Sequence, residues 1–229
     1  MRNWQTRLAS GASLATLALA LSACGGDGDG AGSTTTDTAD LGTSSPCEDV
    51  PVPEPKQADL SPPPAKPSAP TLTAVVKTSC GSFSIALDGK ANPKTVASFE
   101  YLAKEGLFDG TTFHRIVPGF VIQGGDPAGN GTGGPGYSVD EPPSGGTEYT
   151  RGVVAMAKTE VEPPGRSGSQ FFVVTAADAG LPPQYAVVGE VSEGFDVVQS
   201  IEAFGDPAGG EAGEVPGAVV IESVTIAER

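Results

Sequence analysis

The stretch Phe113-His-Arg-Ile-Val-Pro-Gly-Phe-Val-Ile-Gln-Gly-Gly-Asp126 contains the pattern from which the fold of this chain can be predicted. Pro118-Gly119 is a turn signal between two apolar runs, which predicts a strand, a turn and a second strand. Arg115 and Gln123 nevertheless stand within these apolar runs. A polar side chain in such a setting either reaches solvent or serves a polar purpose in the interior.

A second segment, Ser169-Gln-Phe-Phe-Val-Val174, has the same character, with Gln170 at the start of an apolar run. Together with Arg115 and Gln123 it supplies three polar side chains on otherwise apolar strands. Such an arrangement predicts a shallow apolar pocket with a few hydrogen-bonding groups at defined places.

Outward from these segments, the chain is predicted to form short strands and only two helices. One helix is expected over 93–106, because Pro93 suits a first turn, Gly106 suits a C-terminal stop and the apolar residues between them share one face. The second is expected over 195–204. Strands are expected at 72–78, 82–87, 112–117, 119–123, 152–157, 170–175, 186–191 and 219–226.

This order of elements favours a mainly β fold. A parallel α/β sheet would alternate strands with helices regularly, which these elements do not do. A closed antiparallel β-barrel with the two helices over its ends fits better, because closure leaves no exposed strand edges. The domain is placed at residues 71–229, which is long enough to form one hydrophobic core.

The first 23 residues have the features of an export signal. Arg2 and Arg7 precede an apolar run at 8–23, which is shorter than the roughly 20 residues needed to cross a bilayer. The run ends in Leu21-Ser-Ala-Cys24, which resembles a lipobox. We therefore expect a signal peptide at 1–23, lipidation of Cys24, and anchoring at the extracytoplasmic face of the cell membrane. An ordinary secretory signal that ends near a cysteine is the alternative.

Residues 24–70 are expected to be a tether between this anchor and the domain. Residues 25–45 consist mainly of Gly, Ser, Thr and Asp, a composition typical of disorder. The nine prolines from Pro46 to Pro70 favour an extended backbone. We predict that the Pro-rich part is a stiff spacer, and a docking ligand for another protein is the alternative.

Two cysteines remain beside Cys24, namely Cys47 and Cys80. In an oxidising exterior an even pair favours a disulfide, which would join the end of the tether to the start of the domain. Two independent thiols are the alternative, because spacing alone does not establish disulfide geometry.

The charge of the chain argues against several partners. Its formal net charge is −15, and removal of residues 1–23, which hold two arginines and no acids, changes this to −17. Such a chain lacks the basic surface that nucleic-acid binding requires. It also lacks a polybasic patch for anionic lipids, so membrane attachment would depend on the lipid itself.

Three familiar chemistries are also disfavoured. The single histidine, His114, and two distant cysteines lack the ligand spacing of a zinc site, and a serine triad would lack an independent base. Gly129-Asn-Gly-Thr-Gly-Gly134 matches a dinucleotide-binding pattern, but the prolines that follow prevent the helix that such a loop must open. We therefore expect a tight surface loop there, and neither a metal nor a cofactor.

The Phe113–Asp126 segment and Gly168-Ser-Gln-Phe-Phe172 resemble the two signatures of the cyclophilins, in the order and near the spacing of that family. The resemblance covers about residues 72–226. It implies a closed eight-stranded antiparallel β-barrel capped by two α-helices. It also implies peptidyl-prolyl cis-trans isomerase activity on proline-containing polypeptides without a cofactor. Nothing in the sequence indicates more than a monomer.

The resemblance also implies roles for individual residues. Arg115 matches the catalytic arginine of the family, and Phe120 and Gln123 match its neighbours in the site. The positions that would contact the substrate are His114, Val121, Ala157, Lys158, Gln170, Phe172, Leu181 and Tyr185. A module that binds proline-containing segments without isomerising them is the alternative to the enzyme.

Two departures from the family concern the rim of the expected groove. Gly180 stands where several members carry Trp, which puts tight binding of cyclosporin-like macrocycles in doubt. The segment from Lys158 to Gly168 is a few residues longer than in compact members. We expect this segment to reshape one rim of the groove.

Overall fold

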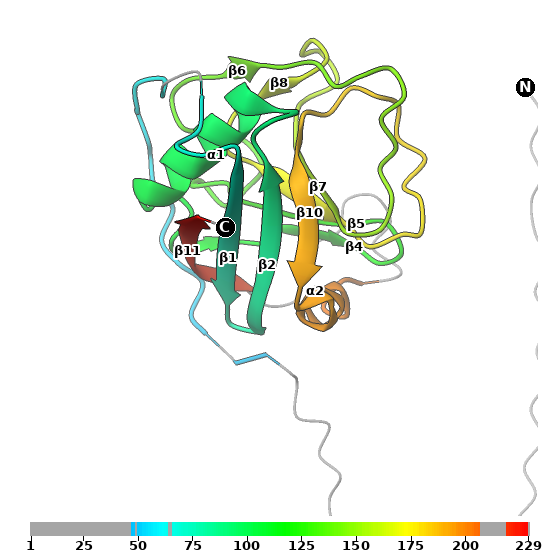
Figure 1. The fold of residues 1–229 in the computed structure, drawn as a ribbon. Coiled ribbons are helices and arrows are strands. Elements are labelled where there is room, and N and C mark those ends of the chain that lie inside the picture. Colours follow the sequence, from blue (N-terminus) through cyan, green and yellow to red (C-terminus); the bar gives the residue numbers. More distant parts are fainter. Residues whose placement is uncertain (1–46, 49, 64–65, 207–218, 229) are drawn as a thin grey trace, which may run out of the picture. The chain divides into compact units, whose positions relative to one another are not determined.

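The computed structural model describes residues 47–48, 50–63, 66–206 and 219–228 (Figure 1). The expected signal peptide at 1–23, the lipidation at Cys24 and the Gly/Ser/Thr-rich part of the tether lie outside these residues. Within them, no helix has the length and apolar character needed to cross a membrane.

The described part of the chain contains eleven strands and two helices. The strands are β1 (Thr71–Thr78), β2 (Gly81–Asp88), β3 (Thr111–Thr112), β4 (Arg115–Val117), β5 (Val121–Gly124), β6 (Val139–Asp140), β7 (Val153–Met156), β8 (Arg166–Ser167), β9 (Phe171–Val174), β10 (Val187–Glu193) and β11 (Val220–Glu228). The helices are α1 (Pro93–Lys104) and α2 (Phe195–Glu202). The predicted mainly β composition with two helices is confirmed.

Nine strands form one antiparallel sheet in the order β3-β11-β1-β2-β10-β7-β9-β5-β4, and β6 pairs with β8 in a small second sheet. The large sheet curls around the core as a half-barrel (Figure 1). The expected closed barrel of eight strands differs from this arrangement, because no ladder joins the two end strands among the described residues. A single bridge between Thr112 and Asp126 links β3 to the chain beyond β5.

The strand predicted at 112–117 is two strands that pair with different partners. β3 pairs with β11, whereas β4 pairs with β5. Between them, the Phe113 N–H donates to the carbonyl of Val219 at 2.9 Å and the Phe113 ring is buried. The chain therefore changes partners at this point, which the apolar pattern of one segment cannot reveal.

The two helices lie at opposite ends of the curled sheet (Figure 1). Helix α1 begins with Pro93 in its first turn and buries Val96, Phe99 and Leu102 among other residues. The shorter α2 buries Val198 and Ile201. The apolar faces predicted for both helices thus cover the open ends of the sheet.

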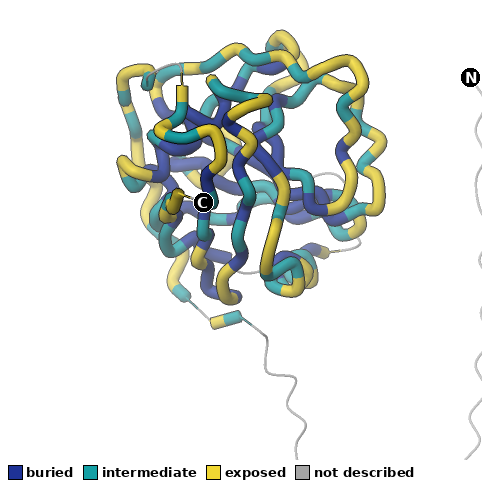
Figure 2. The backbone as a smooth tube through the Cα atoms, in the orientation of Figure 1, coloured by how far each residue is buried: buried dark blue, intermediate teal, exposed yellow. Residues whose placement is uncertain are grey.

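Strands β5, β7 and β9 are buried on both faces. Ile122, Val154 and Val173 belong to the main core inside the curled sheet. Their neighbours Val121, Ala155 and Phe172 belong to a second cluster on the opposite face, because successive side chains of a strand alternate. Figure 2 shows the inner strands of the sheet as largely buried. The second cluster forms an apolar base on the outer face of the sheet.

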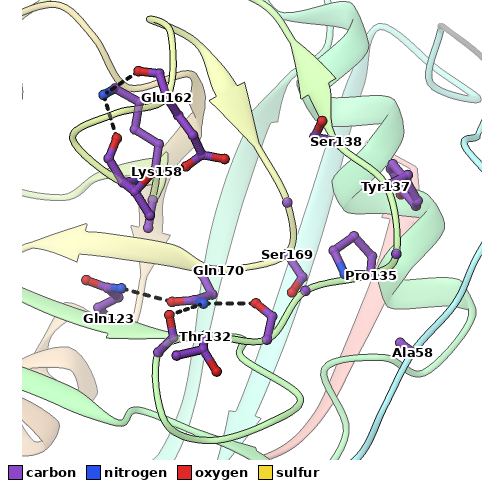
Figure 3. Close-up of a pocket in the computed structure, with 17 residues that line it drawn as sticks. Ala58, Gln123, Thr132, Pro135, Tyr137, Ser138, Lys158, Glu162, Ser169 and Gln170 are labelled. Atoms are coloured by element: carbon purple, nitrogen blue, oxygen red, sulfur yellow. Dashed lines mark hydrogen bonds between the residues drawn. The ribbon is translucent and has the colours of Figure 1, made fainter.

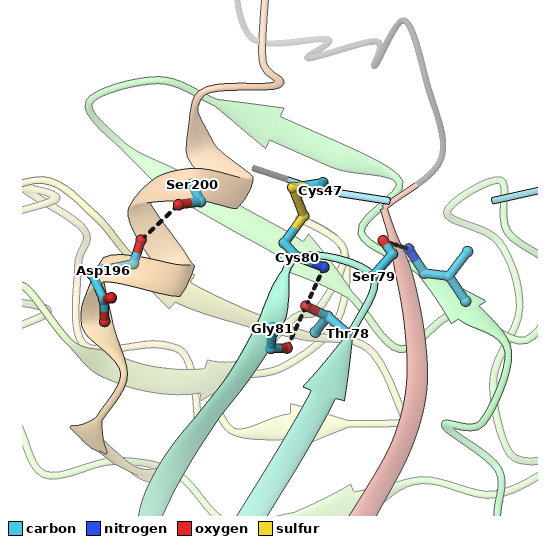
Figure 4. Close-up of a disulfide and its surroundings, with 8 residues drawn as sticks. Cys47, Thr78, Ser79, Cys80, Gly81, Asp196 and Ser200 are labelled. Atoms are coloured by element: carbon cyan, nitrogen blue, oxygen red, sulfur yellow. Dashed lines mark hydrogen bonds between the residues drawn. A yellow bond between two sulfur atoms is a disulfide. The ribbon is translucent and has the colours of Figure 1, made fainter. Parts of the chain in front are cut away.

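The described residues between 47 and 70, which we call the arm, lie along the domain (Figure 1). A disulfide between Cys47 and Cys80 joins the start of the arm to the β1–β2 hairpin (Figure 4). Near its end, the Ser68 N–H and hydroxyl donate to the Glu100 carboxylate of α1 at 2.8 and 2.5 Å. The Pro-rich part was predicted to be a stiff spacer, and its described residues are also bonded to the domain. The non-proline residues of a Pro-rich segment keep backbone N–H groups that can bond to the domain.

Candidate active site

Four neighbouring strands bring the predicted site residues onto one row of the sheet. Arg115 on β4 lies opposite Gln123 on β5, and Gln123 lies opposite Phe172 on β9. Phe172 in turn lies opposite Ala155 on β7. Directly paired residues project from the same face of a sheet, so the register alone places the charged, amide and aromatic groups side by side.

This row borders a depression of about 360 Å³, which we call the small pocket. It is lined by Arg115, Phe120, Val121, Gln123, Ala157, Lys158, Glu160, Phe172, Leu181 and Tyr185. The structure thus brings together nine of the residues predicted for the site, and Glu160 is the one that the sequence did not indicate. The second apolar cluster supplies the floor of the small pocket.

Arg115 is half-buried at the edge of the small pocket. Its guanidinium carbon lies 5.8 Å from the centre of the Phe120 ring, and its Nη1 donates to Gln123 Oε1 at 3.4 Å. A guanidinium is planar and carries five N–H donors in a fixed fork. The ring beneath it and the amide beside it therefore orient the fork relative to the pocket.

Two glutamines extend this contact away from the arginine, and we call them the glutamine relay. Gln123 Nε2 donates to Gln170 Oε1 at 3.1 Å. Gln170 Nε2 donates in turn to the carbonyls of Gly131 and Gly133, both at 3.0 Å (Figure 3). Because each amide donates through nitrogen and accepts through oxygen, the orientation of one glutamine sets that of the next. The relay connects Arg115 to the loop at residues 126–136, which we call the glycine loop.

The buried Asp126 carboxylate folds the glycine loop. Its Oδ1 accepts from the Ala128 N–H at 2.9 Å, and its Oδ2 accepts from the N–H groups of Asn130 and Gly131 at 3.0 and 2.6 Å. A Cβ at Gly133 would lie 2.1 Å from Asp126 Oδ1, so only glycine fits there. The loop is tight, as the sequence predicted. Its Gly131 and Gly133 carbonyls also hold Gln170 beside the small pocket.

The glycine loop forms one wall of a second depression of about 840 Å³, which we call the large pocket (Figure 3). The opposite wall comes from Lys158, Thr159 and Glu162, which belong to the segment at residues 158–168, called the longer rim segment below. Ala58 of the arm also lines this pocket. Gln123, Ala157 and Lys158 line both pockets, so the two are continuous. The run of glycines was the only sequence signal for this wall, and nothing in the sequence indicated Ala58.

Residues 73–226 match the family described as cyclophilin type peptidyl-prolyl cis-trans isomerase/CLD. The chain belongs to this family. It is 40% identical over 178 residues to peptidyl-prolyl cis-trans isomerase B of Streptomyces anulatus, covering 69% of this chain and 98% of that protein. It is 42% identical over 113 residues to peptidyl-prolyl cis-trans isomerase B of Bacillus subtilis, covering 49% of this chain and 77% of that protein.

A crystal structure of a cyclophilin type peptidyl-prolyl cis-trans isomerase from Cryptosporidium parvum has a similar fold. Its TM-score is 0.63 at 27% identity, and the match covers 69% of this chain and 99% of that one. The chain is therefore a cyclophilin-type peptidyl-prolyl cis-trans isomerase, and the activity expected from the two signatures is confirmed.

His114 lies between β3 and β4 of this cyclophilin. It lines neither pocket and falls in the partner change between β3 and β4, and its contact with the substrate stays a prediction. Both of its ring nitrogens are buried, and neither has a partner with hydrogen-bond geometry among the described residues. Burial lowers the pKa of His114, and this effect outweighs the opposite influence of the Asp126 carboxylate. Burial therefore disfavours the charged form of this imidazole.

Tyr149 positions Tyr185, which forms part of one wall of the small pocket. Its hydroxyl donates to the Tyr185 carbonyl at 2.7 Å and accepts from the Tyr185 N–H at 2.9 Å. Burial raises the pKa of Tyr149, so the phenol keeps the proton that it donates. The Tyr185 ring meets Phe172 edge-on, with centroids 5.4 Å apart. Two part-buried hydrogen bonds therefore hold the aromatic wall of the small pocket.

The longer rim segment is anchored at both ends. Lys158 Nζ lies 5.6 Å from the centre of the Tyr185 ring and donates to the carbonyls of Thr159 and Glu162. At the other end, Arg166 forms two 2.9 Å hydrogen bonds with Asp140 of β6. The hydrogen bond from Arg166 lowers the pKa of Asp140.

Among the residues that the structure describes, no group of three or more His, Cys, Asp and Glu side chains could hold a metal ion.

Proposed function

We propose that this isomerase accelerates rotation about X-Pro bonds in exported polypeptides, with Arg115 as the group that stabilises the twisted amide. Rotation is slow because amide resonance gives the C–N bond double-bond character, with a barrier of about 18–20 kcal/mol. No covalent bond breaks, so the reaction requires no nucleophile. It requires a site that favours the twisted amide over either planar form.

Arg115 suits this requirement for a chemical reason. Resonance is lost when the amide twists, and the prolyl nitrogen regains a lone pair that can accept a hydrogen bond. A charged donor at the pocket edge would interact with that lone pair in the transition state and not in the planar ground state. Phe120, Phe172 and Leu181 would hold the pyrrolidine ring while the preceding carbonyl moves. A barrier lower by about 7 kcal/mol corresponds to roughly 10⁵-fold acceleration.

One observation carries this proposal. The Arg115 guanidinium is oriented by Phe120 and Gln123 at the edge of a pocket of about 360 Å³ whose floor is apolar. A module that only bound proline-containing segments would have no use for an oriented cationic donor at this place. The roles of the other pocket residues, and action as a monomer without nucleic acid, belong to the same proposal.

The test is a coupled prolyl-isomerisation assay on the full-length chain and on Arg115→Ala. We expect kcat/KM to fall by about 100-fold or more, the effect of removing one donor that acts on the transition state. Arg151→Ala is the matched control, because the Arg151 guanidinium also lies over an aromatic ring, 5.7 Å from that of Phe195, but lines neither pocket. Full activity in Arg115→Ala would overturn the proposed role.

We also propose that the isomerase is a lipoprotein, attached through Cys24 to the extracytoplasmic face of the cell membrane. The Leu21-Ser-Ala-Cys24 sequence supports this, and a disulfide at Cys47 suits an oxidising compartment. Metabolic labelling with a radioactive fatty acid should mark the wild type and Cys47→Ser but not Cys24→Ser. Equal labelling of Cys24→Ser would contradict the anchor.

A further inference from the structure

The arm holds both ends of the glycine loop. The Lys56 N–H donates to the carbonyl of Pro127 at 2.7 Å, and the Leu60 N–H donates to the carbonyl of Pro135 at 2.8 Å. Pro127 and Pro135 are both buried. The two hydrogen bonds therefore secure the loop where it leaves the domain and where it returns.

Backbone packing adds to these hydrogen bonds. A Cβ at Gly136 would lie 2.8 Å from the Cα of Asp59, so the loop and the arm are in direct backbone contact. Leu60 packs against the main core, and Ala58 lines the large pocket. Figure 3 shows Ala58 on the arm across from the segment that carries Pro135. The arm thus contributes to the shape of the site through its backbone and small side chains.

The middle of the same loop holds the glutamine relay. The carbonyls of Gly131 and Gly133 accept both hydrogen bonds from Gln170 Nε2, which leaves Gln170 Oε1 facing Gln123. If the loop shifted, Gln170 would lose the contacts that keep its amide from turning over. Gln123 would then lose its orientation, and with it the contact to Arg115.

We propose that the arm positions Arg115 through the backbone N–H groups of Lys56 and Leu60, acting by way of the glycine loop and the glutamine relay. This inference rests on the proposed role of Arg115. The arm is suited to such a task because it is held at both ends, by the Cys47–Cys80 disulfide and by the Ser68–Glu100 hydrogen bonds. A Pro-rich backbone also has little conformational freedom to lose when it is ordered.

The test removes one backbone donor of the arm in the full-length chain. Leu60→Pro eliminates the N–H and keeps an extended backbone, whereas Leu60→Ala removes only the side chain. Gln57→Pro is the matched control, because Gln57 is exposed and its N–H has no partner within the described chain. We expect Leu60→Pro to lower kcat/KM by about five- to tenfold, the size of one hydrogen bond, while Gln57→Pro stays within about twofold.

A double-mutant cycle separates positioning from general loss of structure. In a Gln170→Leu background the relay is already cut, so Leu60→Pro should lower kcat/KM by less than about twofold further. Equal fold-changes in both backgrounds, or equal effects of Leu60→Pro and Gln57→Pro, would overturn the inference. If Leu60→Pro does not fold, Lys56→Pro compared with Lys56→Ala carries the same test at the other end of the loop, since both variants lose the Lys56 Nζ contact to the Asp109 carbonyl. If Arg115→Ala loses activity and the arm variants do not, the positioning role of the arm is refuted and the proposed role of Arg115 stands.

Discussion

Arg115 and Gln123 are directly paired across β4 and β5, and Arg115 Nη1 donates to Gln123 Oε1 at 3.4 Å. Both residues lie on hydrogen-bonded strands, so the sheet register sets the distance between them. Phe172 on the next strand continues the same row. Groups held on regular strands keep their geometry better than groups on loops. The sheet thus places the proposed catalytic group, and the glutamine relay refines its orientation.

The first prediction concerns this contact. Gln123→Leu keeps the volume of the side chain but removes both the acceptor for Arg115 and the donor to Gln170. We expect kcat/KM to fall by roughly 10- to 150-fold, because a hydrogen bond to a charged group contributes roughly 1.5–3 kcal/mol. Gln57→Leu, on the exposed part of the arm, is the control and should retain full activity. Unchanged activity in Gln123→Leu would show that the relay has no role in catalysis.

The second prediction concerns pH. Burial lowers the folded-state pKa of His114 below its unfolded value of about 6.5. Between these two pKa values the unfolded chain binds more protons than the folded chain, so the free energy of unfolding falls as the pH decreases through about 6.5. Above about pH 6.5 His114 is unprotonated in both the folded and the unfolded chain, so its protonation no longer lowers the free energy of unfolding.

Denaturant unfolding of the wild type and His114→Gln, from about pH 8 to pH 5, measures this effect. The wild type should lose more stability than His114→Gln over that range, because the glutamine does not titrate. A difference between the two proteins that is the same at every pH would contradict a buried neutral imidazole.

The third prediction concerns the disulfide. Cys47 and Cys80 are separated by 33 residues, and closing a loop of that length stabilises the folded state by about 4 kcal/mol. The double variant Cys47→Ser/Cys80→Ser should therefore unfold at a lower denaturant concentration. A reducing agent should lower the midpoint of the wild type and leave the double variant unchanged. If reduction affected both equally, the disulfide would not be the source of the stability.

The fourth prediction concerns the buried phenol. Tyr149→Phe leaves the Tyr185 N–H and carbonyl without their partner, which should cost about 1–3 kcal/mol of stability. Because Tyr185 lines the small pocket, KM should also rise in the isomerase assay. Tyr101→Phe is the control, since the Tyr101 hydroxyl has no hydrogen-bond partner in the described part of the chain. Thermal unfolding of the two variants side by side distinguishes the outcomes.

Much of the site follows from local sequence pattern. The apolar runs around Arg115, Gln123 and Gln170 predicted strands with polar side chains at defined places, and all three side chains meet at the site. The partner change at Phe113 was not predictable from local pattern. The hydrogen bond of Phe113 to Val219 and the pairing of Arg115 with Gln123 both depend on residues elsewhere in the chain. The position of His114 was not predictable for the same reason, since a side chain at such a change of partner does not follow the strand alternation.

The sequence by itself determined which side chains share a face, because strand alternation is a local property of the backbone. It therefore identified Arg115 and its polar neighbours before any contact was known. Only the tertiary structure decided that the arm returns to the domain and bonds to Pro127 and Pro135. Composition describes how stiff a Pro-rich segment is, whereas its backbone N–H groups bond to whichever carbonyls the path of the chain brings near. The environment that orients Arg115 thus comes from segments far apart in the sequence.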